Sequence, residues 1–191
     1  MIRALIFDCF GVLYRDNLSM LYEVVPNEKK QELHDIIHAT DHGFISRAEY
    51  FEKIAELAGK EASDIREIEN SQFSRNEPLI ARAKELKSDF KIGLLSNIGD
   101  ETMDRLFPEP ERSELFDVFV LSSEIGLIKP AIELFNVTAE RIGFEPEECL
   151  MIDDIPVNVD GARTAGMQAM LFTTNYEFEQ GLQRLLGQAH A

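Results

Sequence analysis

Short hydrophobic runs alternate along most of the chain with segments of helical periodicity. Four of these runs are almost wholly apolar and a fifth is weaker; in chain order they are Ala4–Phe7, Ile92–Leu95, Val118–Leu121, Leu150–Ile152 and the weaker Ala169–Phe172. Their length and their continuous hydrophobicity are typical of strands that are buried on both faces of a parallel sheet. The pattern therefore predicts five such strands.

Apolar residues spaced as on one face of a helix follow or precede the later runs. The segments are Glu77–Lys87, Ala131–Ile142, Val157–Ala165 and Phe178–Leu186. Because strands and helices alternate, we expect an α/β fold with right-handed crossovers, in which a doubly wound parallel sheet carries helices on both faces.

One part of the chain breaks this alternation. From about Asp16 to Asn76 we find no strand pattern and four helical patterns, which are Met20–Val25, Glu28–Ala39, Arg47–Ala58 and Ile65–Phe73. Ser46 followed by Glu49 is a capping-box signature for the third of these helices. We therefore predict an α/β core of residues 1–15 and 76–191, with residues 16–75 inserted as a helical cap.

Composition and charge narrow the possible partners. The 191 residues are 45% hydrophobic, which suffices for a proper core, and 19 basic against 35 acidic residues give a formal net charge of -16. Such a surface repels nucleic acid and anionic membranes. The apolar start of the chain is too short for a signal peptide, and no run approaches a membrane span. We expect a cytoplasmic monomer or homodimer with Cys9 and Cys149 as free thiols.

Polar residues stand after the predicted strands, where open α/β sheets bind ligands. Asp8, Ser96, Asn97, Asp153 and Asp154 follow their strands directly, and Lys129 stands in the loop after the third strand. Adjacent acids at such an edge repel one another unless a cation or a proton lies between them. Mg²⁺ takes carboxylate oxygens together with substrate phosphate. These residues therefore indicate attack on phosphorus by Asp8, with Ser96, Asn97 and Lys129 as phosphate binders and Lys129 neutralising charge.

Four motifs in this order resemble those of the haloacid dehalogenase-like hydrolase superfamily. They are "FDCFGVL" with Asp8, "LLSN" with Ser96, "IGLIKP" with Lys129, and "MIDDIPVNVDGARTAGM" with the paired acids. The resemblance extends from Ile2 to Phe172. It implies that Asp8 is the nucleophile of a phosphatase acting on small phosphorylated metabolites. It also implies that Mg²⁺ is held by Asp8, the main-chain carbonyl of Phe10, Asp154 and Asp153, and that a helical cap follows the first strand.

Phe10 departs from the phosphatase pattern, which usually has a second Asp at this position to protonate the leaving group and then activate water. Loss of such acid–base help commonly costs about 10²–10⁴ in rate. Two interpretations follow. The enzyme acts on phosphates with good leaving groups, as in anomeric sugar, acyl or aryl phosphates, or it has little phosphatase activity and serves as a phosphate-binding or regulatory protein. The chain resembles most the sugar-1-phosphate phosphatase-like members and the phosphatase-like domain of epoxide hydrolases, which also lack this Asp.

An aromatic residue at the position of Phe10 also occurs in the 2-haloacid dehalogenases of the superfamily, which need no metal. Paired acids such as Asp153 and Asp154 suit a metal and poorly suit a haloacid's carboxylate, so this alternative is weaker. Cys9 and Arg15 have the C-x₅-R spacing of thiol phosphatases. The intervening residues are too bulky for an anion-binding loop, and Asp8 disfavours a thiolate.

Three histidines of the predicted cap have a spacing that can bind zinc. His34, His38 and His42 lie at i, i+4 and i+8, which places them on one helix face. The apolar stripe of this helix is formed by other residues, so we assign the histidines to a solvated or boundary face. One of them, or Arg47, is a candidate for contact with the substrate.

Overall fold

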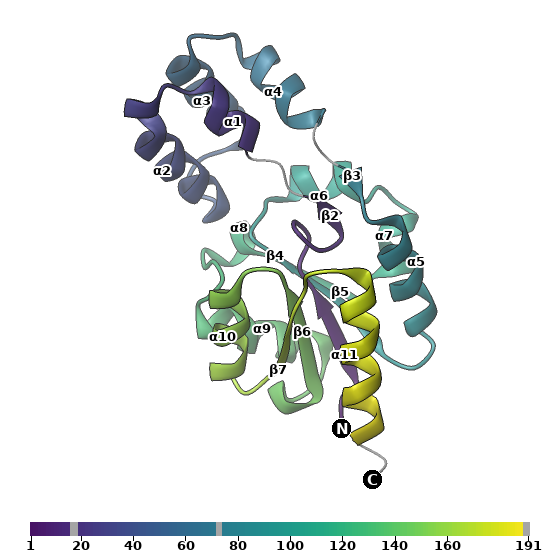
Figure 1. Ribbon diagram of the computed structural model, residues 1–191. Helices are drawn as coiled ribbons and strands as arrows, with labels where there is room; N and C mark the ends of the chain where they lie inside the picture. Colours follow the sequence, from purple (N-terminus) through teal and green to yellow (C-terminus); the bar gives the residue numbers. More distant parts are fainter. Residues whose placement is uncertain (16–18, 72–73, 189–191) are drawn as a thin grey trace.

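A five-stranded parallel sheet forms the centre of the computed structural model, which describes residues 1–15, 19–71 and 74–188 (Figure 1). The strand order is β5-β4-β1-β6-β7, and every neighbouring pair is parallel. The strands are β1 (Ala4–Phe7), β4 (Lys91–Ser96), β5 (Val118–Leu121), β6 (Cys149–Asp153) and β7 (Gln168–Leu171). Each of the five predicted strands is confirmed, with its ends within one residue of the predicted ones.

The register of the sheet brings its polar strand ends to one edge. Phe7 is aligned with Leu94 of β4 and with Ile152 of β6, so Asp8 leaves β1 at the height of Asp153. The backbone N–H of Asp8 donates to the carbonyl of Ile152 at 2.9 Å. After β1 the chain builds one side of the sheet and then crosses to the other, which makes this edge the switch point where open α/β sheets bind ligands.

Helices cover both faces of the sheet, because alternate residues of β1 point into two separate hydrophobic cores. Leu5 and Phe7 belong to one core with α5 (Glu77–Leu86) and α11 (Asn175–Gln188). Ala4 and Ile6 belong to the other core with α9 (Ile132–Ile142) and α10 (Pro156–Thr164). The four helices predicted here are thereby confirmed.

The core also contains short helices that the sequence pattern did not predict. They are α6 (Asp100–Leu106), α7 (Glu111–Leu115), α8 (Ser122–Ile125) and the 3₁₀ turn η2 (Pro146–Glu148). Each has at most two turns, which is too few for an apolar face to repeat and so to be recognised.

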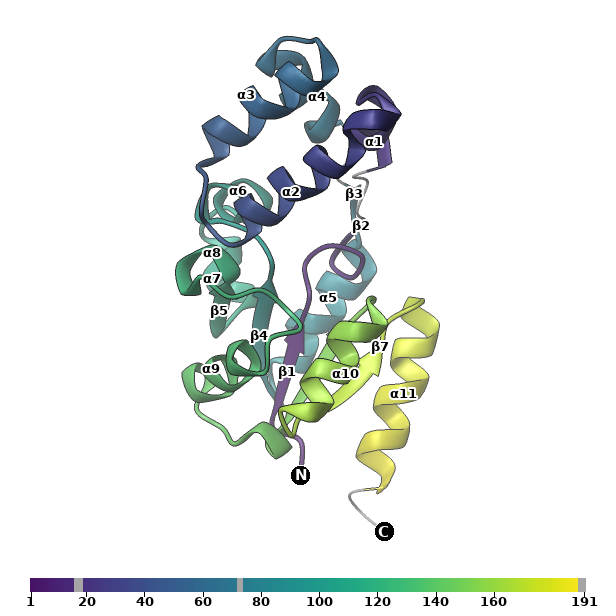
Figure 2. The ribbon, with the colours of Figure 1, turned by 90° about the vertical axis from the view of Figure 1, so that its left-hand side faces the viewer.

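Four helices pack around a third hydrophobic core beyond the polar edge of the sheet (Figures 1 and 2). They are α1 (Ser19–Val24), α2 (Lys30–Asp41), preceded by the 3₁₀ turn η1 (Asn27–Lys29), α3 (Arg47–Ala58) and α4 (Ala62–Asn70). We call them the cap helices. The four helical patterns predicted here are confirmed, although Phe73, the last residue of the fourth, lies outside the described residues. No helix within the described ranges combines the length and hydrophobicity that crossing a membrane requires.

The capping box predicted at the start of α3 is present. Glu49 N–H donates to the Ser46 hydroxyl oxygen at 3.2 Å, and the Ser46 N–H donates to the Glu49 carboxylate at 2.8 Å. These bonds satisfy N–H groups that the first turn of a helix leaves without partners. The start of α3 is thereby fixed, and with it the position of Arg47.

A two-stranded antiparallel ribbon joins the cap helices to the core. It consists of β2 (Tyr14–Arg15) and β3 (Ser74–Arg75). The expectation of no strand between Asp16 and Asn76 was therefore wrong at β3, since two residues are too short to show alternation. Arg75 ties the ribbon to α7 through two bonds to Glu111, of 3.0 and 2.5 Å. The predicted division into core and cap at residues 15/16 and 75/76 stays a prediction.

Candidate active site

Three carboxylates converge at the polar edge of the sheet. Asp8, Asp153 and Asp154 each offer one oxygen, and these oxygens lie within 4.8 Å of one another. Asp8 and Asp153 are buried, whereas Asp154 is half-buried. Among the described residues this is the one group of three or more ligating side chains close enough to share an ion. Such oxygen donors suit a hard divalent cation such as Mg²⁺.

Lys129 joins two of the acids from a separate segment of the chain. Its ammonium lies 2.7 Å from Asp8 Oδ1 and 2.7 Å from Asp153 Oδ2, and it donates to the carbonyl of Leu95 at 3.2 Å. Burial lowers the pKa of the ammonium, but the charges of Asp8 and Asp153 outweigh burial and raise the pKa above its ordinary value. Lys129 is therefore a permanent positive charge beside Asp8.

Asn97 positions Lys129 through its main chain. The Lys129 N–H donates to Asn97 Oδ1 at 2.9 Å, and the Asn97 amide donates back to the Lys129 carbonyl at 3.5 Å. Ser96, at the end of β4, is buried and lines a cavity that Asp8 and Lys129 also line. The structure thus brings the predicted nucleophile, the predicted phosphate binders and the paired acids to this edge, and it shows Asn97 hydrogen-bonded to the main chain of Lys129.

The charge balance of the site favours a bound cation. Burial, with the charges of Asp153 and Asp154, raises the pKa of Asp8 to about 7 against the lowering effect of Lys129. Three acids face one ammonium, so a further positive charge relieves their repulsion. Asp153 is held in place by the amide of Asn158, at 3.0 and 3.2 Å, and by the N–H of Ile155 at 2.9 Å.

The loop after β1 passes close to Asp154. Gly11 has φ +80°, a conformation that side chains rarely adopt, and a Cβ there would lie 2.1 Å from Asp154 Oδ2. The preceding residue, Phe10, is half-buried and lines the cavity. The role predicted for its main-chain carbonyl as a metal ligand stays a prediction.

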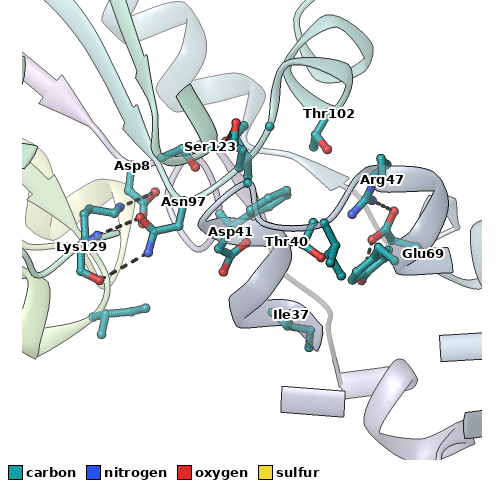
Figure 3. A pocket seen from close by; sticks show the side chains of 18 of the residues that line it. Asp8, Ile37, Thr40, Asp41, Arg47, Glu69, Asn97, Thr102, Ser123 and Lys129 are labelled. Atoms are coloured by element: carbon teal, nitrogen blue, oxygen red, sulfur yellow. Dashed lines mark hydrogen bonds and ion pairs between the residues drawn. The ribbon is translucent and has the colours of Figure 1, made fainter. Parts of the chain in front are cut away.

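A cavity of about 500 Å³ lies between this edge and the cap helices (Figure 3). Its core side includes Asp8, Ser96, Lys129 and Asp154. The residues that the cap helices and their connecting loop contribute are Ile37, Thr40, Asp41, Gly43, Ile45, Ser46, Arg47, Tyr50 and Glu69. A volume of this size suits a small-molecule ligand.

Sequence reasoning missed most of these cap residues, because no motif marks which side chains of a helix face a cavity. Arg47 is the exception among the candidates, since it lines the cavity and none of the three histidines is among the described lining residues. The rings of His34 and His38 lie 4.6 Å apart on α2. Cys9 is wholly buried, which does not suit a nucleophile that must meet a substrate.

Comparison with known proteins identifies the family. A family model described as haloacid dehalogenase-like hydrolase matches residues 2–166. This chain belongs to that family. The resemblance and the α/β fold predicted from the sequence are thereby confirmed. The haloacid dehalogenase-like fold is also shared with a solved enzyme of this family from Bacteroides thetaiotaomicron, bt-2542 in a magnesium complex, at 25% identity and a TM-score of 0.77 over 91% of this chain and 94% of that one.

Two of three curated relatives of this haloacid dehalogenase-like chain carry phosphatase names, and the third is named as a cyclase. Phosphatase MT3486 of Mycobacterium tuberculosis (strain CDC 1551 / Oshkosh) is 30% identical over 68% of this chain and 61% of its own. Pyrophosphatase PpaX of Bacillus cereus (strain AH820) is 24% identical over 86% of this chain and 80% of its own. Drimenol cyclase drtB of Aspergillus calidoustus is 25% identical over 98% of this chain. The chain thus spans less than two thirds of two of these relatives, 61% of MT3486 and 37% of drtB.

Proposed function

We propose that this chain is a Mg²⁺-dependent phosphatase of small phosphorylated metabolites that works through an aspartyl-phosphate. The observation that carries the proposal is the cluster that Asp8 forms with the acids of the "IDD" segment and with Lys129, whose ammonium bridges Asp8 and Asp153, beside a cavity large enough for a small ester. The phosphatase names of the relatives and the magnesium complex of bt-2542 support it.

The carboxylates of Asp8, Asp153 and Asp154, with the main-chain carbonyl of Phe10, are the groups that would hold Mg²⁺. The donor set fits, because oxygen ligands of three acids lie within 4.8 Å of one another next to a single ammonium. Bound there, Mg²⁺ supplies positive charge to the phosphate oxygens and to the crowded acids.

Asp8 acts as the nucleophile. One of its carboxylate oxygens forms a bond to phosphorus. At the same time the bond from phosphorus to the leaving oxygen breaks, and the leaving oxygen keeps the electron pair. Lys129 and Ser96 hold the non-bridging oxygens, and the fixed charge of Lys129 stabilises the charge that moves in the transition state. Water then cleaves the aspartyl-phosphate, which restores Asp8 and releases inorganic phosphate.

Phe10 sets the leaving groups that this chemistry accepts. Phe10 lines the cavity that Asp8 also lines, and its side chain has no proton to donate. An acyl or aryl oxygen leaves without protonation, whereas an alkoxide needs it. We therefore propose a preference for phosphates with good leaving groups.

Hydrolysis of acetyl phosphate and para-nitrophenyl phosphate, with Mg²⁺ and with EDTA, tests the proposal. We expect turnover by the wild type that EDTA abolishes and that Asp8→Asn lowers at least about 10³-fold. Cys9→Ser is the matched control beside Asp8, and we expect it to retain activity because that thiol takes no part in the chemistry.

The same preparations separate the alternatives. Chloride release from 2-chloropropionate that is independent of Mg²⁺ would make the chain a dehalogenase. Binding of inorganic phosphate without Asp8-dependent turnover of either ester would make it a phosphate-binding or regulatory protein. Either result overturns the proposed phosphatase.

A further inference from the structure

Three histidines of the α2 segment form a column of rings on the surface of the cap helices. The ring centroids of His34 and His38 lie 4.6 Å apart, and those of His38 and His42 lie 6.0 Å apart. The side chain of His34 is 53% exposed, and His38 is exposed as well. Within the described ranges none of the three lines the cavity, so the proposed hydrolysis does not use them.

The spacing of these rings suits a metal ion better than it suits packing. Positions i and i+4 of a helix share one face, and two imidazoles placed there can bind one Zn²⁺. Packing explains a ring pair that is buried, whereas His34 and His38 are open to solvent. When both are protonated, two like charges at this spacing also destabilise the helix. A bound cation uses the same two rings in their neutral form.

Two of the three rings are placed to share an ion. In the part of the chain that the structure describes, the acids at Asp8 are the one group of three ligating side chains whose atoms lie within 4.8 Å of one another. His42 is engaged elsewhere, because its Nδ1 donates to the carbonyl of His38 at 2.9 Å and its ring is stacked 5.0 Å from that of Phe44. The closer pair is therefore His34 and His38, and water completes the coordination of an ion bound there.

The surroundings of this pair favour a neutral imidazole and a positive ligand. Asp35 Oδ1 lies 3.8 Å from His34 Nδ1, and a carboxylate beside that nitrogen leaves Nε2 as the ligand atom. Burial and the charges of His34 and His42 lower the pKa of His38, which keeps it in the form that binds metals. His38 also lies in the last turn of α2, where the helix dipole places partial negative charge.

The chemistry of the ligands decides the class of ion. Imidazole nitrogen suits Zn²⁺, Ni²⁺ and Cu²⁺, whereas Mg²⁺ and Ca²⁺ prefer oxygen ligands such as those of the acid cluster at Asp8. We infer that His34 and His38 form a second metal site, specific for a divalent transition-metal ion such as Zn²⁺. The ion would join two successive turns of α2, the helix that contributes Ile37 and Thr40 to the wall of the cavity.

Isothermal titration with ZnCl₂ tests the site, with Mg²⁺ in large excess to occupy the acid cluster. We expect His34→Gln and His38→Gln each to lower the affinity for Zn²⁺ at least about tenfold, because the helix presents the second imidazole at a high effective concentration. His42→Gln is the matched control, since it removes a neighbouring imidazole outside the pair, and we expect it to retain the affinity within about threefold. Zn²⁺ that displaces Mg²⁺ from the acids binds all variants alike.

Two further measurements make the site specific. NiCl₂ should show the same dependence on the two histidines, and CaCl₂ should show none. Zn²⁺ should raise the midpoint of thermal unfolding of the wild type more than that of His38→Gln, and the midpoints without Zn²⁺ check that each variant is folded. Zn²⁺ binding that does not depend on His34 and His38, or a loss in His42→Gln as large as in His38→Gln, overturns the inference.

Discussion

At the scale of single residues, we propose that the side chain of Phe10 decides which leaving groups the site accepts. Phe10 lines the same cavity as Asp8, which precedes it by two residues in the chain. We predict that Phe10→Asp raises turnover of an alkyl phosphate such as cyclohexyl phosphate by about 10²-fold or more, because it supplies general acid–base catalysis. The measurement is kcat for that ester and for acetyl phosphate, whose good leaving group should gain far less.

The matched control for this substitution is Phe10→Leu. It shortens the side chain in the same place without adding a carboxyl group, so any gain that comes from extra room alone appears in both variants. A gain for cyclohexyl phosphate that Phe10→Leu reproduces, or no gain in Phe10→Asp, contradicts the assignment of a missing proton donor.

The core residues of the site could be predicted because their positions follow from the sheet. Asp8, Ser96 and Asp153 each end or directly follow a buried apolar run, and parallel strands end at one edge. Lys129 stands in the loop after the third strand, and both its place in that loop and the motif "IGLIKP" pointed to it. What no pattern shows is its pairing with both Asp8 and Asp153, since that depends on the path of the loop after α8.

At the scale of elements, the loop between β1 and β2 shapes the acid cluster. Gly11→Ala places a Cβ 2.1 Å from Asp154 Oδ2 and must displace this short side chain. We predict that the Mg²⁺ concentration for half-maximal activity rises at least about tenfold, as is common when groups that orient metal ligands are disturbed. A magnesium titration of acetyl phosphate hydrolysis measures it.

Gly143→Ala separates this effect from backbone strain. Gly143, at the end of α9, has φ +87°, close to the φ of Gly11, but a Cβ there meets nothing within 4 Å. It should cost about 1–2 kcal/mol of unfolding free energy from the left-handed conformation and leave the magnesium requirement unchanged. If both variants shift the titration equally, the contact with Asp154 is not the cause.

Elements were predictable in proportion to their length. Helices such as α3 and α9 repeat an apolar face over several turns, whereas α8 and the ribbon strand β3 are too short to carry a period. The orientation of α3 and α4 over the sheet is a property of packing between helices. Arg47 was therefore only one candidate among several in the sequence, and Tyr50 and Glu69 were not found.

At the scale of the whole molecule, local and global charge act in opposite directions on an anionic ester. The chain carries a formal net charge of -16, while Lys129 is a buried positive charge beside Asp8 at the proposed phosphate site. The acidic surface repels the ester over long distances. At 0.1 M ionic strength, salt largely screens this repulsion beyond about 10 Å. The contact that we propose between Lys129 and the phosphate is much shorter, so salt screens it far less.

The difference in range between the surface repulsion and the local attraction predicts an unusual salt dependence of kcat/KM. We expect kcat/KM for para-nitrophenyl phosphate to rise when KCl is increased from low concentration to 0.2 M at saturating Mg²⁺, because screening weakens the long-range repulsion and leaves the local attraction. Potassium acetate as the added salt controls for effects specific to chloride. A fall of kcat/KM with either salt would mean that local positive charge governs the encounter, and that the surplus of acidic residues lies away from the mouth of the cavity.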